Sequence, residues 1–184
     1  MRYPAPGSDE LSARVVDLLR GRGIGSAVDH ARGLDHGAWV PLMLMYPAAD
    51  IPVAQLSVQS ALGPKHHFEI GRAIAGLRDE GVLIVGSGSF THDLSRAGAH
   101  RTVPPDVPAF ADWLDDAVVA GRTSDAIEYR ELAPYASRNH PTEEHLLPIF
   151  VAMGAGGGGP ARRIHSGVAH GVIAMNAYAF GDQI

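Results

Sequence analysis

The sequence predicts an α/β fold in which helices flank a mainly parallel central sheet. The first observation is a strand–helix–strand pattern, because apolar runs at Ile51–Val58 and Val82–Val85 flank an amphipathic segment at Phe68–Arg78. Strands connected through a helix usually pair in parallel. The second is an apolar content of 46% over 184 residues, which is enough to bury the core of one domain over residues 1–184.

The N-terminal segments carry two further predictions. Ser8–Arg22 has apolar residues at helical spacing, with Ser8 as the N-cap and Gly23 as the stop. Ala38–Tyr46 is apolar on almost every side, which fits either a buried helix or a strand. Pro41 would suit the first turn of such a helix.

The C-terminal half adds three helices and a last strand. Helical spacing is clearest in the first of these helices, where Phe110, Leu114 and Val118 share one face. The last segment alternates enough to form a strand. The expected helices span Asp106–Gly121, Ser124–Tyr135 and Thr142–Met153, and the expected strand spans Gly171–Phe180.

Composition excludes several classes of function. The net charge of −5, with no stretch that concentrates Lys and Arg, argues against nucleic-acid binding. No apolar run approaches the length of a membrane span. The absence of cysteine removes disulfides, thiolate catalysis and Cys–zinc sites, so any metal must be held by His and carboxylates. We therefore expect a cytoplasmic protein that binds neither nucleic acid nor membranes.

Two histidines stand out, because each follows a different local signal. His92 comes after the apolar run Val82–Val85 and a tight turn, and His145 lies in the first turns of the expected helix Thr142–Met153. Strand ends and helix starts present side chains to a common crevice in α/β folds. The two imidazoles are therefore candidates to share a metal ion, although two ligands alone hold an ion weakly.

The glycine-containing turn Gly86–Ser89 admits two interpretations. Glycines after a strand permit positive φ angles and a close backbone approach, often to a phosphate. The spacing fits neither a P-loop nor a dinucleotide-binding fingerprint, so we interpret the turn as aiming His92 into a site. His36, between Asp35 and Gly37, is on spacing alone an ordinary loop histidine.

Several stretches form a specific combination in their order along the chain. They are Gly33–Trp39, Met45–Val53, Gln55–Ser57, Gly86–Leu94, Pro141–Pro148 and Ala177–Gly181. Together they resemble the class III extradiol ring-cleavage dioxygenases, and among these the DOPA-dioxygenase-like branch of the LigB superfamily. The resemblance covers nearly the whole chain and implies a LigB-like α/β fold.

The resemblance implies an enzyme that opens catechol-type rings with O₂ and a mononuclear non-haem metal, Fe(II) or Zn(II), one per complete site. It implies that His92 and His145 are metal ligands, with acid/base catalysis as the alternative role of His92. It also implies that His36 is a catalytic residue near the substrate. The expected partners are a small aromatic diol and O₂. Fe(II) with open positions accommodates a bidentate catecholate and O₂ while a nearby histidine moves protons.

The resemblance further implies an incomplete site. Family members carry a Gly-His-Gly-Ser-Pro turn and a Ser-Ala-His-Trp strand end ahead of the part that matches this chain, and both histidines are metal ligands. We therefore expect the C-terminal two-thirds of a catalytic domain, incomplete at the N-terminal side of its fold and nearly inactive alone. A further copy of the chain in a homo-oligomer, or a complementing N-terminal chain, is the expected protein partner.

Two other functions stay open at this point. The chain is alternatively a partner-dependent subunit or a non-catalytic fragment, or it is a zinc-dependent hydrolase on the same scaffold. A serine hydrolase is disfavoured, because Ser87 and Ser89 do not stand in a Gly-x-Ser-x-Gly elbow.

Overall fold

The computed structural model describes residues 3–99 and 102–181. The chain forms two compact units, Met1–Ser57 and Val58–Ile184, and each is described by itself. The single domain expected over residues 1–184 stays a prediction.

The first unit begins with the helix that the sequence predicts. Helix α1 spans Asp9–Arg20, and the Ser8 side chain caps it by accepting a hydrogen bond from the backbone amide of Leu11 at 3.1 Å. Val15 and Leu19 are its buried residues. The predicted N-cap and the predicted apolar face are both confirmed.

The apolar segment of the first unit is a helix rather than a strand. Helix α2 spans His36–Met45, and the Asp35 side chain accepts from the amide of Ala38 at its start. Two details of the prediction are wrong. Pro41 lies inside the helix rather than in its first turn, and none of the helix residues is buried, with Leu44 78% exposed. Because the apolar residues share no single face, packing on one side leaves the others uncovered.

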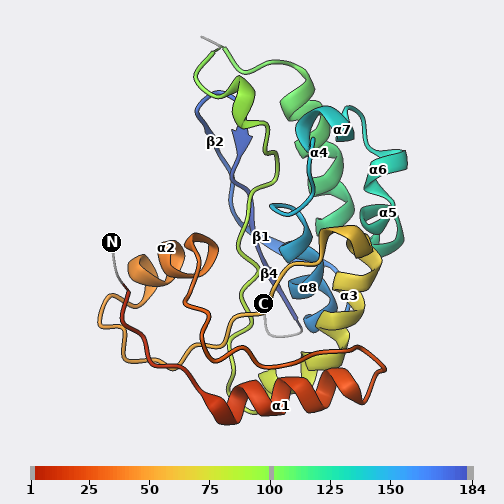
Figure 1. Cartoon of the computed structure of the whole chain (residues 1–184). Helices are drawn as coiled ribbons and strands as arrows, with labels where there is room; N and C mark the ends of the chain where they lie inside the picture. Colours follow the sequence, from red (N-terminus) through yellow and green to blue (C-terminus); the bar gives the residue numbers. More distant parts are fainter. Residues whose placement is uncertain (1–2, 100–101, 182–184) are drawn as a thin grey trace. The chain divides into compact units, whose positions relative to one another are not determined.

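The second unit contains the amphipathic helix expected at Phe68–Arg78. Helix α3 spans Gly63–Ile74 and continues as the 3₁₀ turn η2 at Ala75–Arg78, after the short 3₁₀ turn η1 at Ser60–Leu62. The predicted face is buried, as its members Ile70, Ile74 and Leu77 show. Helix α3 packs beside α8, Leu147–Ala155 (Figure 1).

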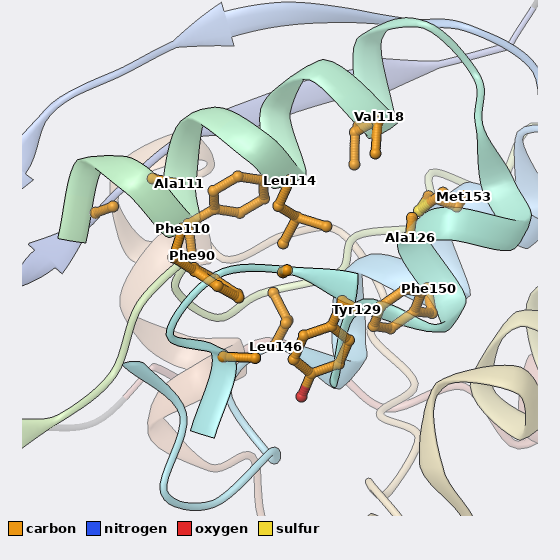
Figure 2. Packing of buried hydrophobic residues seen from close by; sticks show 14 of the residues in the cluster. Phe90, Phe110, Ala111, Leu114, Val118, Ala126, Tyr129, Leu146, Phe150 and Met153 are labelled. Carbon is orange, nitrogen blue, oxygen red and sulfur yellow. The ribbon is translucent and has the colours of Figure 1, made fainter. Parts of the chain in front are cut away.

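Helix α4, Asp106–Val119, forms one wall of the main hydrophobic core, as its apolar spacing predicts. Phe110, Leu114 and Val118 are fully buried against side chains of the following helices (Figure 2). No helix in the described part of the chain is long and apolar enough to cross a membrane. The shorter helices are η3 Leu94–Arg96, α5 Thr123–Ile127, α6 Tyr129–Leu132 and α7 Ala136–Asn139.

The strands form two small antiparallel sheets. Strand β1, Ala161–His165, pairs with β4, Ala177–Phe180, with a register shift between Arg163 and His165. Strand β2, Val168–Ala169, pairs with β3, Ile173–Ala174. The predicted last strand, Gly171–Phe180, is therefore two short strands, each with its own partner.

The α/β class is confirmed, but the mainly parallel sheet is not found among the described residues. Ile51–Val58 and Val82–Val85 run without helix or ladder, so the expected strand–helix–strand pair does not form. The second run is not buried either, since Leu83 is 62% exposed and Val85 is 47% exposed. A strand needs a hydrogen-bonding neighbour, and local apolar content does not supply one.

The helix expected at Thr142–Met153 begins later than predicted. Helix α8 starts at Leu147 with Pro148 in its first turn, and Thr142 does not cap it. Proline lacks an amide hydrogen and its ring clashes with a helical carbonyl four residues earlier, so a helix rarely passes through it. His145 consequently lies in the turn before α8 rather than in a helix.

Candidate metal centre

The segment that carries His92 is held by hydrogen bonds on both sides. The hydroxyl of Thr91 donates to the carbonyl of Val172 at 2.7 Å and accepts from the amide of Ala174 at 2.6 Å. On the other side, the amide of His92 donates to the carbonyl of Asn139 at 2.7 Å. Thr91 is fully buried, so these bonds fix the backbone from which the His92 imidazole projects.

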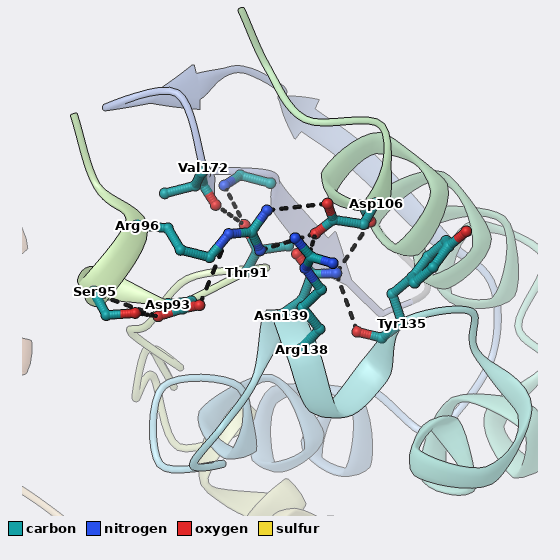
Figure 3. A network of polar contacts seen from close by, with 10 residues as sticks. Thr91, Asp93, Ser95, Arg96, Asp106, Tyr135, Arg138, Asn139 and Val172 are labelled. Carbon is teal, nitrogen blue, oxygen red and sulfur yellow. Dashed lines mark hydrogen bonds and ion pairs between the residues drawn. The ribbon is translucent and has the colours of Figure 1, made fainter. Parts of the chain in front are cut away.

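A buried ion-pair network holds the chain just after His92 (Figure 3). Two guanidinium nitrogens of Arg96 donate to the two carboxylate oxygens of Asp106 at 2.9 and 3.0 Å. Burial raises the pKa of Asp106, but the hydrogen bonds and charges of Arg96 and Arg138 outweigh it, so the pKa lies below its usual value. The network ties η3, which follows His92, to the first residue of α4.

The glycines of the turn Gly86–Ser89 allow the chain to approach the residues before α8. A Cβ atom at residue 88 would overlap the carbonyl oxygen of His145, and one at residue 86 would overlap that of Pro148. Neither glycine has a positive φ, so close approach rather than a left-handed conformation explains them. The amide of Ser89 donates to the carbonyl of His145 at 2.9 Å, which joins the two halves of the site.

The turn before α8 is anchored through Glu143. The Tyr129 hydroxyl and the Arg130 guanidinium donate to the same carboxylate oxygen of Glu143, at 2.6 and 3.1 Å. The carbonyl of Glu143 accepts the amides of Leu146 and Leu147. These contacts fix the position of the two residues between them, Glu144 and His145.

Three side chains of types that can ligate a metal meet where these two segments touch. The imidazole rings of His92 and His145 are stacked, with centroids 3.4 Å apart and planes 14° apart. Nδ1 of His145 lies 3.1 Å from a carboxylate oxygen of Glu144. One ligand atom from each residue lies within 4.8 Å of the others, and all three side chains are half-buried.

The electrostatics keep the carboxylate charged and the imidazole of His92 neutral. Burial, and then the neighbouring His145, lower the pKa of His92 below its ordinary value. Burial raises the pKa of Glu144, but hydrogen bonds from its own backbone, Thr142 and His145 lower it more. A neutral imidazole and an ionised carboxylate are the protonation states that bind a cation.

The donor set fits a first-row divalent metal. Two imidazoles and one carboxylate are the ligands of the facial triad that holds non-haem Fe(II), and zinc accepts the same donors. In one arrangement His92, Glu144 and His145 all bind the metal. In the other, the Glu144 carboxylate accepts the Nδ1 proton of His145, which leaves Nε2 of that ring as the ligand atom. In both arrangements Glu144 belongs to the site.

The predicted residues are placed as follows. His92 and His145, which the sequence singled out, lie together in the second unit. His36 is the first residue of α2 in the first unit and is exposed, and its place near a substrate stays a prediction. The sequence reasoning did not single out Glu144. Pro148 was the available signal, because it marks residues 142–146 as a turn in which neighbouring side chains can converge.

The sequence matches, over residues 1–181, the family described as the catalytic LigB subunit of aromatic ring-opening dioxygenase. The chain belongs to the LigB family. The cluster of His92, Glu144 and His145 therefore lies in a chain of a family of aromatic ring-opening dioxygenases.

Relatives and a solved structure agree with the LigB assignment. The chain is 49% identical to a 4,5-DOPA dioxygenase extradiol of Beta vulgaris over 97% of this chain and 68% of that protein. It is 40% identical to a 4,5-DOPA dioxygenase extradiol of Escherichia coli over 83% of this chain and 58% of that protein. A crystal structure of an uncharacterised Escherichia coli protein superposes with a TM-score of 0.85 at 34% identity, covering 98% of this chain and 76% of that one.

Proposed function

We propose that this LigB-family chain takes part in extradiol cleavage of a small catechol-type diol by O₂. The observation that carries the proposal is the convergence of His92, Glu144 and His145 in one cluster. The names of the Beta vulgaris and Escherichia coli relatives support the substrate class. They make L-DOPA the first substrate to test.

The chain's own residues supply ligands and a proton acceptor. His145 and Glu144 would hold a divalent metal, with His92 either as the third ligand or as the base beside it. Bound there, Fe(II) would offer open positions for a diol and O₂ and would supply the redox chemistry that side chains lack. Zn(II) is the alternative ion for the same donors.

As a base, His92 is suited to removing a proton from the diol. Because its pKa is lowered by burial and by His145, the ring is neutral at neutral pH and has a free lone pair to accept the proton. The stacked His145 ring and the backbone bond to Asn139 hold the imidazole in one orientation. A held base needs less reorganisation when the proton moves.

We further propose that another polypeptide segment completes the site and that the 184-residue chain alone turns over slowly. The support is the run Val82–Val85, which lies directly before the site and forms no ladder in the described part of the chain. Its exposed Leu83 and Val85 side chains present an apolar surface that another strand would cover. The proposed occupant is the part of the Beta vulgaris relative that lies outside the aligned stretch, supplied as a second chain.

The experiment measures ring opening by the chain with and without that second chain. Both samples are loaded with Fe(II) without O₂, then given L-DOPA and isotopically labelled O₂. We expect a ring-opened product that contains both atoms of one O₂, formed much faster by the two-chain sample. The variants His145→Ala and Glu144→Gln should abolish it, whereas His165→Ala, on an exposed strand residue, should not.

Two results would contradict the proposal. One is a two-chain sample that folds and binds iron yet forms no ring-opened product from a panel of catechols. The other is product formation that survives His145→Ala, which would place the chemistry elsewhere. Rapid turnover by the 184-residue chain alone would contradict only the proposed need for a second segment.

A further inference from the structure

A buried histidine outside the ligand cluster connects the segment before His92 with the turn before His145. His140 is fully buried, and its Nε2 lies 2.9 Å from the carbonyl oxygen of Phe90. A carbonyl can only accept, so Nε2 carries the proton and donates. The other ring nitrogen, Nδ1, is buried without a hydrogen-bond partner among the described residues.

The ring of His140 acts on the His92 side of the site. The His140 ring binds the carbonyl of Phe90. The carbonyl of Asn139, the residue before His140, binds the amide of His92. Phe90 and His92 are therefore both bonded to the same short segment. Thr91, between them, is held from the opposite side by Val172. With the bond from His140, residues 90, 91 and 92 are each held by a hydrogen bond to another segment.

The backbone of His140 acts on the His145 side. Its carbonyl accepts a hydrogen bond from Arg130 at 2.8 Å, and the same guanidinium binds Glu143, which precedes Glu144 and His145. One residue is thus bonded to the segment before His92 through its ring and to the turn before His145 through Arg130.

We propose that His140 is a positioning residue that sets the His92 imidazole against that of His145. Burial lowers the pKa of His140 to about 4, so at neutral pH the ring is neutral and adds no positive charge beside a metal site. A buried Nδ1 without a hydrogen-bond partner lowers the stability of the fold. An apolar residue at this position would avoid that loss, so the bond from Nε2 is the feature that the histidine adds.

The experiment compares two polar replacements of different reach in the metal-free 184-residue chain. In His140→Gln the amide nitrogen reaches the position of Nε2, whereas in His140→Asn it reaches only that of Nδ1. His67→Gln is the control, because His67 is also a buried histidine of the second unit but bonds Gly63 and Gln59 instead. The readouts are the ring-current shifts of the stacked His92 and His145 protons and the exchange rate of the His92 amide.

We expect His140→Asn to lose the ring-current shifts and to exchange the His92 amide about tenfold faster. His140→Gln should keep both readouts at their wild-type values. His67→Gln should also leave both unchanged, even where it lowers the melting temperature. Zinc affinity should fall by about tenfold in His140→Asn only. The proposal rests on the proposed site, but the first two readouts need neither metal nor turnover, so they fail independently of the proposed function.

Three results would overturn the proposal. One is wild-type ring shifts and amide exchange in His140→Asn, and another is equal loss of both in His67→Gln. The third needs no variant: nitrogen chemical shifts of the wild-type chain that place the His140 proton on Nδ1 would remove the bond on which the proposal depends. This last measurement decides the matter even where His140→Asn does not fold.

Discussion

Replacement of Gly88 by alanine should separate the two halves of the candidate metal centre. The added methyl group would overlap the backbone carbonyl of His145, which cannot rotate away as a side chain could. Overpacking of this kind costs about 1–3 kcal/mol, and the Ser89–His145 hydrogen bond at stake contributes about 1 kcal/mol. We therefore expect Gly88→Ala to lower the free energy of unfolding by about 2–4 kcal/mol.

The matched control is Gly76→Ala, at an exposed position where an added Cβ meets no other atom within 4 Å. It should change stability by less than about 1 kcal/mol. Urea unfolding is followed by the fluorescence of Trp113, which packs against the core of the second unit, in a Trp39→Phe background. Equal stability of the two alanine variants, together with unchanged stacking of His92 on His145, would refute the close approach.

Three further predictions concern the supports of the site. Burial lowers the folded-state pKa of His140 from 6.5 to about 4, so the unfolded chain binds more protons between these pH values. The free energy of unfolding therefore falls as the pH falls through this window, by about 3 kcal/mol in all. His140→Gln should flatten that part of the curve of unfolding free energy against pH, and a curve of unchanged slope would contradict the assignment. Arg96→Met should destabilise the chain by about 3–5 kcal/mol in urea unfolding, because it leaves the buried Asp106 carboxylate without its main partner, and a loss below about 1 kcal/mol would count against the network. Tyr129→Phe should cost about 1.5–3 kcal/mol in the same assay, since its hydroxyl donates to the charged Glu143, and a neutral result would speak against that bond.

The parts of the fold set by local chemistry were predictable from the sequence. The Ser8 cap of α1 and the buried face of α4 follow from one residue type and one spacing, and the structure has both. His92 and His145 were predictable as a pair because each stands at a boundary between an apolar run and a turn. These signals need no knowledge of distant parts of the chain.

What the sequence could not supply depended on contacts between distant residues. The run Val82–Val85 has strand composition, yet whether it pairs depends on a neighbour that its own residues do not specify. The place of Glu144 in the cluster depends on the turn before α8, which a helix expected to begin at Thr142 does not contain. His140 gave no sign of its role, since only the folded chain brings its ring to the carbonyl of Phe90.

Zinc binding to the purified chain tests most directly the claim that His92, Glu144 and His145 form one metal site. Titration calorimetry at neutral pH should show one ion bound per chain in the wild type and in the control His165→Ala. Affinity should fall by at least about tenfold in Glu144→Gln and more in His145→Ala. Undiminished binding by His145→Ala, with the chain still folded, would contradict the account.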